Sequence, residues 1–132
     1  MATTSRTKDI RMLRVHLLSG TAPLEEIRKL SPKELIELLD NRNKNGEVRV
    51  SSLLWDAIRE QKERLALELI RQIRAKLGIE EQKLILFHKG SEPMAFSDFA
   101  SREGTKLIEE AVKDWSKIGA GIPNDATLDL KR

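Results

Sequence analysis

Apolar residues recur along most of the chain at the three- and four-residue spacing of amphipathic α-helices. These stripes predict helices over residues 10–18, 24–30, 32–39, 54–77, 80–87, 96–100 and 107–115, and almost no strand. The polar stretch 59–64 interrupts the longest stripe, which predicts two shorter helices with a break near Gln61 rather than one rod. Gly104 is expected to separate the last two helices.

Local signals mark where two of these helices begin. Ser31 followed by Pro32 and Glu34 is typical of a helix start, with Ser31 as the N-cap and Glu34 completing a capping box. Ser51 or Ser52 is expected to cap the long fourth helix in the same way.

A turn-rich segment without apolar residues, 40–46, separates the third predicted helix from the fourth. Asn45-Gly46 within it is a strong turn signal, and Val48 and Val50 alternate with polar residues after it. The segment therefore predicts a projecting loop or short hairpin.

One domain is the expectation for 132 residues of which 39% are hydrophobic. Residues 8–118 are predicted to form it, between a flexible N-terminus, 1–7, and a flexible C-terminal tail, 119–132. A short helix with one apolar stripe is not stable alone, so the helices must pack on one another. The predicted fold is all-α, either a short stacked array of helix pairs or a small helical bundle.

Three segments share a pattern: 20–39, 52–70 and 96–112. In the first, the matching residues are Gly20, Ala22-Pro23-Leu24, Ile27, Glu34-Leu35-Ile36 and Leu38-Leu39. This segment resembles an ankyrin repeat, and the set resembles a divergent ankyrin-like array of the kind found in some bacterial effectors. Ser31 and Gln61 stand where the family pattern has its turn glycine. The equivalent core positions Ile27, Ala57 and Ala100 depart from the family period of about 33 residues, the second interval containing an insertion. The resemblance implies stacked helix pairs that bind proteins through loop tips and the first helix of each pair.

Composition removes several kinds of chemistry. With no cysteine and two histidines, the chain has no disulfide, thiolate site or three-histidine metal site. The asparagines at 41, 43 and 45 superficially copy a calcium loop, but Asn41 stands where Asp is usual and Ser52 where the final Glu is usual. His16 and His88 have no triad-like neighbours. We therefore predict no catalytic residue, metal or cofactor, and no enzyme.

The net charge is +3, from 24 basic and 21 acidic residues interleaved along the chain. Such a balance gives a weak overall field and favours a solvated, ion-paired surface. The local basic excess in 6–14, together with 42–49, leaves a nucleic-acid-binding domain as the alternative function. No apolar run is long enough for a transmembrane helix or a signal peptide, which predicts no membrane partner and a cytoplasmic protein, with non-classical export to a host cell as an alternative.

The sequence thus predicts a non-enzymatic module that binds another protein. Carried over from the ankyrin resemblance, the partner-binding residues are loop-tip and first-helix positions that supply rim charge and one aromatic anchor: Lys29, Arg42, Lys44, Arg49, Trp55, Arg59 and Arg102. Trp55 has an alternative interpretation as a core residue. Neither the partner nor the oligomeric state follows from the sequence.

Overall fold

The computed structural model describes residues 2–42, 48–87 and 92–120, and it is all-α, as predicted. The helices are α1 (Ala2–Ser19), α2 (Glu25–Arg28), α3 (Pro32–Leu39), α4 (Ser52–Arg59), α5 (Glu63–Lys76), α6 (Ile79–Phe87), α7 (Phe96–Glu103), α8 (Lys106–Trp115) and α9 (Lys117–Ala120). Between α3 and α4, the two-residue strands β1 (Asn41–Arg42) and β2 (Val48–Arg49) pair antiparallel, which agrees with the expected hairpin.

Helix boundaries agree with the sequence pattern at the centre of the chain and differ at its ends. The expected break is present, because Gln61 lies between α4 and α5 with a left-handed φ of 57°. α1 begins at Ala2, inside the stretch 1–7 that was expected to be flexible and ahead of the helix predicted from residue 10, and α9 extends beyond the predicted domain end at residue 118. The predicted flexible tail is mostly outside the described residues.

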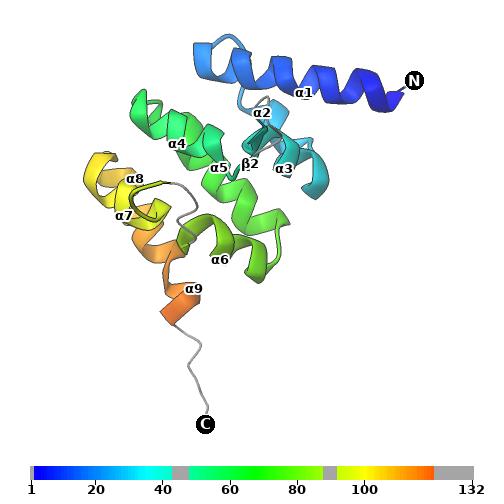
Figure 1. Ribbon diagram of the computed structural model, residues 1–132. Helices are drawn as coiled ribbons and strands as arrows, with labels where there is room; N and C mark the ends of the chain where they lie inside the picture. The colour runs from blue at the N-terminus through cyan, green and yellow to red at the C-terminus, as the bar shows by residue number, and fades with distance from the viewer. Residues whose placement is uncertain (1, 43–47, 88–91, 121–132) are drawn as a thin grey trace.

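The helices lie side by side in antiparallel pairs (Figure 1). α4 packs against α5 and α7 against α8, and these two pairs stack so that α4 contacts α7 and α5 contacts α8. At the other end the pairing is crossed. The first helix of the pair, α2, contacts α5, the second helix of the next pair, while α3 contacts α4. α1 lies across this end and packs on α3 and α4, while α6 packs on α7 and α9.

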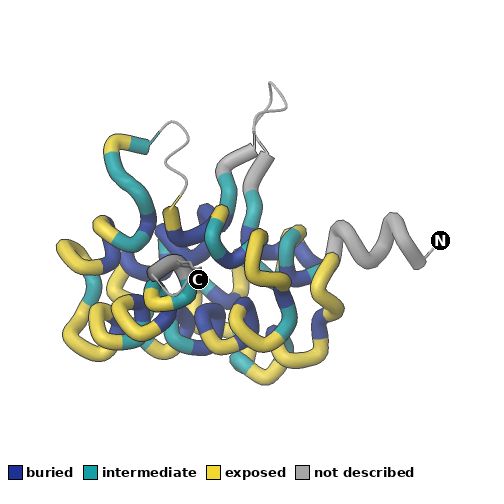
Figure 2. Tube along the Cα trace, turned by 90° about the horizontal axis from the view of Figure 1, so that it is seen from below, coloured by how far each residue is buried: buried dark blue, intermediate teal, exposed yellow. Residues whose placement is uncertain are grey.

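One continuous core runs from α1 to α8 through the middle of the molecule (Figure 2). Its largest fully buried side chains are Trp115, Phe96, Ile27, Leu35, Leu38, Leu39, Leu53, Leu54, Ile58, Leu69, Ile73 and Leu86. An aromatic cluster fills the α4–α7–α8 part: Trp55 stacks on Phe99 with ring centroids 4.5 Å apart, and Phe96 meets Trp55 and Trp115 edge-on.

The predicted cap of α3 is confirmed, whereas at α4 Ser51 occupies the N-cap position but its side chain makes no capping hydrogen bond. The Glu34 amide donates to Ser31 Oγ, and the Ser31 amide donates to Glu34 Oε1. Ser51 instead has a left-handed φ of 53°, and its amide donates to Asp40 Oδ1. Ser52 Oγ donates to the Leu39 carbonyl. The tight return from the hairpin uses both serines to tie the start of α4 to the end of α3.

Gly104 allows α7 and α8 to meet closely. Its backbone conformation is ordinary, with φ −78°, but a Cβ at this position would lie 2.6 Å from the Ala100 carbonyl oxygen and 2.8 Å from Ile108 Cγ2. The glycine is therefore needed for space rather than for an unusual φ.

Candidate functional site

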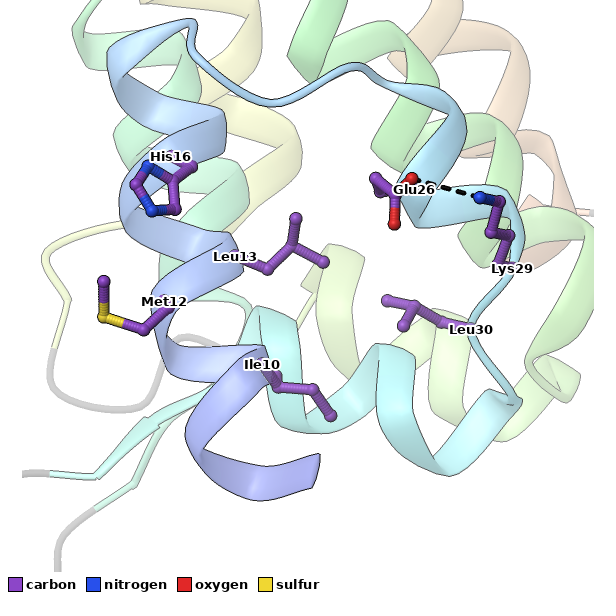
Figure 3. A pocket seen from close by; sticks show the side chains of 7 residues that line it. All are labelled: Ile10, Met12, Leu13, His16, Glu26, Lys29 and Leu30. Atoms are coloured by element: carbon purple, nitrogen blue, oxygen red, sulfur yellow. Dashed lines mark hydrogen bonds and ion pairs between the residues drawn. The ribbon is translucent and has the colours of Figure 1, made fainter. Parts of the chain in front are cut away.

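A groove with a volume of about 380 Å³ lies between α1 and α2 (Figure 3). One wall comes from α1 and the other from α2 and the residues just after it. The lining residues are Ile10, Met12, Leu13, His16, Glu26, Lys29 and Leu30. A groove of this size falls within the range of small-ligand and side-chain pockets.

The floor of the groove is apolar and its edges are mixed. Ile10, Leu13 and Leu30 point toward one another from the two walls (Figure 3). Met12 lies on the outer side of α1, and its side chain is 50% exposed. Val15 is exposed to a similar degree, 56%, and lies one turn further along the same helix. A water-exposed edge of apolar side chains beside an apolar floor is typical of interaction surfaces.

The polar groups at the groove edge are occupied by one another. Lys29 Nζ lies 3.1 Å from Glu26 Oε2 in an exposed ion pair. His16 Nδ1 is 2.9 Å from Thr21 Oγ1, which also contacts Ser19 at the end of α1. The lining therefore presents no uncompensated carboxylate or ammonium to a ligand.

The α1 wall is fixed by Arg14, which reaches the C-terminal end of α3. Its guanidinium donates to the carbonyl oxygens of Glu37 and Leu38 at 3.3 Å and 2.7 Å, and also to that of Asp40. The last carbonyls of a helix lack partners within it, and a cation there also suits the helix dipole. Burial lowers the pKa of Arg14, and the carboxylates of Asp40 and Asp56 oppose that change.

The α2 wall is fixed by α5 in two places. Lys76 Nζ donates to the carbonyl oxygens of Ile27, Arg28 and Leu30 at 3.4, 2.7 and 2.6 Å. The Arg28 guanidinium donates through Nε and Nη2 to the two carboxylate oxygens of Glu68 at 3.2 and 3.1 Å.

Glu68 is 4% exposed and would be costly to bury without partners. Besides Arg28, the Gln72 amide donates to it at 2.8 Å, and Arg71 lies 3.5 Å away. The hydrogen bonds from Arg28, with smaller contributions from Gln72 and the charge of Arg71, hold the pKa of Glu68 below its ordinary value against the opposing effect of burial. The hydrogen bond to Glu68 likewise raises the pKa of Arg28.

The structure brings together only some of the residues predicted from the sequence. Lys29 lies at the groove, and Arg102 is exposed in the last turn of α7, on a different part of the molecule. The side chains of Arg42, Lys44 and Arg49 lie outside the described residues.

Trp55 and Arg59 are adjacent on α4, but the ring is 5% exposed and belongs to the aromatic cluster. Trp55 is therefore a core residue, and its buried ring is not placed to act as an exposed aromatic anchor. Arg59 covers the cluster, with its guanidinium 5.6 Å from the Trp55 ring centroid, 5.3 Å from that of Phe99, and 3.4 Å from Asp56.

Sequence reasoning missed most of the groove. A signal for part of it was present, because Met12 is apolar at a position of the first helix that lies outside the buried stripe. On the other wall Lys29 was among the residues predicted to bind a partner, but nothing in the sequence marked Leu30, which looks like an ordinary residue after a short helix. Arg14, which was grouped with the basic N-terminal residues, holds α3 in place.

The described part of the chain contains no group of three or more His, Asp or Glu side chains able to hold a metal ion. In the same residues, no helix combines the length and the apolar character needed to cross a membrane. No protein-family model, curated protein or solved structure matches the chain. The likeness to ankyrin repeats thus stays a prediction.

Proposed function

We propose that this chain is a protein-binding module and that the groove between α1 and α2 is its docking surface. The observation that carries the proposal is the groove whose apolar floor is formed by the buried Ile10 and Leu30 and the partly buried Leu13, with the exposed Met12 at its edge. Binding energy in protein interfaces is concentrated where an apolar side chain of one partner fills a pocket of the other.

The edge of the groove defines the kind of partner. Glu26 and Lys29 neutralise each other, so a charged group entering the groove would lose its hydration without gaining a counter-ion. The suitable occupant is a large aliphatic or aromatic side chain on an uncharged stretch of an amphipathic helix. Such a helix would place its apolar face against Met12 while one residue enters between α1 and α2.

The test begins with peptides selected from a displayed library of random 16-residue sequences on the immobilised full chain. Their affinities are then measured for the wild type, for Leu13→Gln in the groove, and for the matched control Leu107→Gln. Leu107 is an exposed apolar residue on α8, far from the groove along the chain. We expect selected peptides to bind the control as they bind the wild type and to lose at least tenfold in affinity for Leu13→Gln.

Leu13 also packs against the core, so Met12→Asp provides a second variant at an exposed position. Circular dichroism establishes that each variant is folded. The same loss of affinity in Met12→Asp supports the groove as the docking surface. Peptides that bind both groove variants and the control equally, or a selection in which no peptide is enriched, contradict the proposal.

A further inference from the structure

We propose that α5 determines the shape of the groove, with Lys76 and Glu68 acting as positioning residues for the α2 wall. The inference rests on the proposed docking function, yet its geometric part is measurable without any partner. Neither residue lines the groove, so their effect would pass entirely through α2.

α2 has little means of holding its own position. It has four residues, Glu25–Arg28, with no side-chain cap at Leu24. Ile27 is its one buried side chain. A single turn of helix is not stable by its own hydrogen bonds, because fixing its backbone costs more free energy than those bonds contribute. Its position must be fixed by contacts from elsewhere in the molecule.

Lys76 supplies the fixing contact at the C-terminal end of α2. One ammonium group donates to the carbonyls of Ile27, Arg28 and Leu30, two of them within 2.7 Å. The last of these carbonyls belongs to a residue of the groove floor. An ammonium carries three donors, and all three are directed at this one end of the chain segment.

Glu68 supplies the second fixing contact, from α5 to the side chain of Arg28 on α2. Its carboxylate receives two hydrogen bonds from Arg28, a geometry that defines orientation as well as distance. Arg28 stands between Glu26 and Lys29, which line the groove. The two contacts from α5 therefore place three of the seven lining residues, namely Glu26, Lys29 and Leu30.

A purely structural role for Lys76 would make a different prediction. In that case its loss would lower the global stability, while the protein that remains folded would keep the same groove and the same affinity. A positioning role requires that α2 move or open in the folded state. The two are separated by local measurements on α2 made under conditions where the whole protein is folded.

The experiment compares Lys76→Met, Lys76→Arg and Arg74→Met in the full chain. Arg74 is the matched control, since it is a basic residue of the same helix whose partner is Asp114 on α8. Amide hydrogen exchange is measured by NMR at Ile27 and Leu30, whose amides donate to Leu24 and Ile27. We expect exchange at both to accelerate at least tenfold in Lys76→Met, to stay unchanged in Arg74→Met, and to recover in Lys76→Arg.

Affinity for the selected peptides is the second readout. Lys76→Met and Glu68→Gln are each expected to weaken peptide binding about tenfold, with Arg74→Met unchanged. The inference is overturned if exchange and chemical shifts of residues 25–30 stay as in the wild type while only global stability falls. If α2 exchange accelerates but no peptide binds even the wild type, the positioning role stands and the docking function fails.

Discussion

Helices α4–α8 contact one another mainly through hydrocarbon and aromatic rings, whereas α1–α3 combine burial in the same core with polar side chains that reach backbone carbonyls. In the first region, Trp55, Phe96, Phe99 and Trp115 pack ring against ring. In the second, Arg14 and Lys76 donate to the ends of α3 and α2.

This difference shows how a small domain can add short helices to an existing core. The four-residue α2 buries only Ile27, so hydrophobic packing alone stabilises it weakly, whereas the eight-residue α3 also buries three leucines. A lysine or arginine from a neighbouring helix pairs several orphan carbonyls at once and fixes both position and direction. Such an attachment leaves apolar surface open between α1 and α2, which is where the groove lies.

The largest effect is expected from removing Trp115, the fully buried tryptophan that packs on Phe96 in the aromatic cluster. Trp115 is fully buried, and its indole NH donates to Gln82 Oε1 at 2.9 Å. Trp115→Ala should lower the free energy of unfolding by about 3–5 kcal/mol, measured by urea denaturation, because it creates a cavity and removes the indole donor from the buried Gln82 Oε1. Trp115→Phe should lower the free energy of unfolding by a smaller amount. A loss below 1 kcal/mol in the alanine variant would show that this region does not depend on ring packing.

A smaller loss is expected from Arg14→Met, which removes the cap of α3 but keeps most of the hydrocarbon. Several carbonyls then lose a charged donor, and we expect the free energy of unfolding to fall by about 2 kcal/mol. Arg11→Met, on an exposed position of the same helix, is the control and should be nearly neutral. Equal losses in the two variants would mean that the carbonyl contacts contribute nothing specific.

Glu68→Gln should give a pH-dependent loss of about 1 kcal/mol at pH 7, since Arg28 is half-exposed and solvent weakens the pair. The pKa of Glu68 is lowered in the folded protein, so the stabilisation is complete above its unfolded-state pKa of about 4.3 and disappears as pH falls through the folded-state value. The stability difference between wild type and variant should therefore be constant from pH 5 to 7 and shrink below about pH 4. A difference that does not shrink below about pH 4 would contradict a role of the charge.

The smallest effect is expected from Arg74→Met. Its pair with Asp114 is 3.0 Å long and exposed on both sides, a kind of contact that usually adds little. Thermal unfolding monitored by circular dichroism should give a midpoint indistinguishable from that of the wild type. A clear drop would show that exposed pairs between α5 and α8 matter as much as the attachments of α1–α3.

Features that depend on neighbours in sequence were predictable, and those that depend on distant partners were not. The capping box at Ser31 and the break at Gln61 follow from short patterns, and both are present. The role of Lys76 was not visible, because its partners are 46 to 49 residues away. For Trp55 the pattern allowed both core and surface positions, and stacking on Phe99 from a later helix places it in the core. A side-chain cap was expected at Ser51 because that expectation uses only neighbouring residues. The chain instead returns from the hairpin in a left-handed turn, and the Ser51 amide donates to Asp40.

The long sequence separation between α2 and Lys76 also determines the order in which parts of the molecule fold. Leu30 is made 46 residues before Lys76, so during synthesis α2 emerges with its carbonyls bound only to water. A contact across so long a loop forms late, after the entropy of closing that loop has been overcome by other interactions. The α4–α5 hairpin, whose contacts are local, is expected to fold first and to serve as the template on which the earlier part of the chain settles. The groove between α1 and α2 is then among the last parts of the molecule to form.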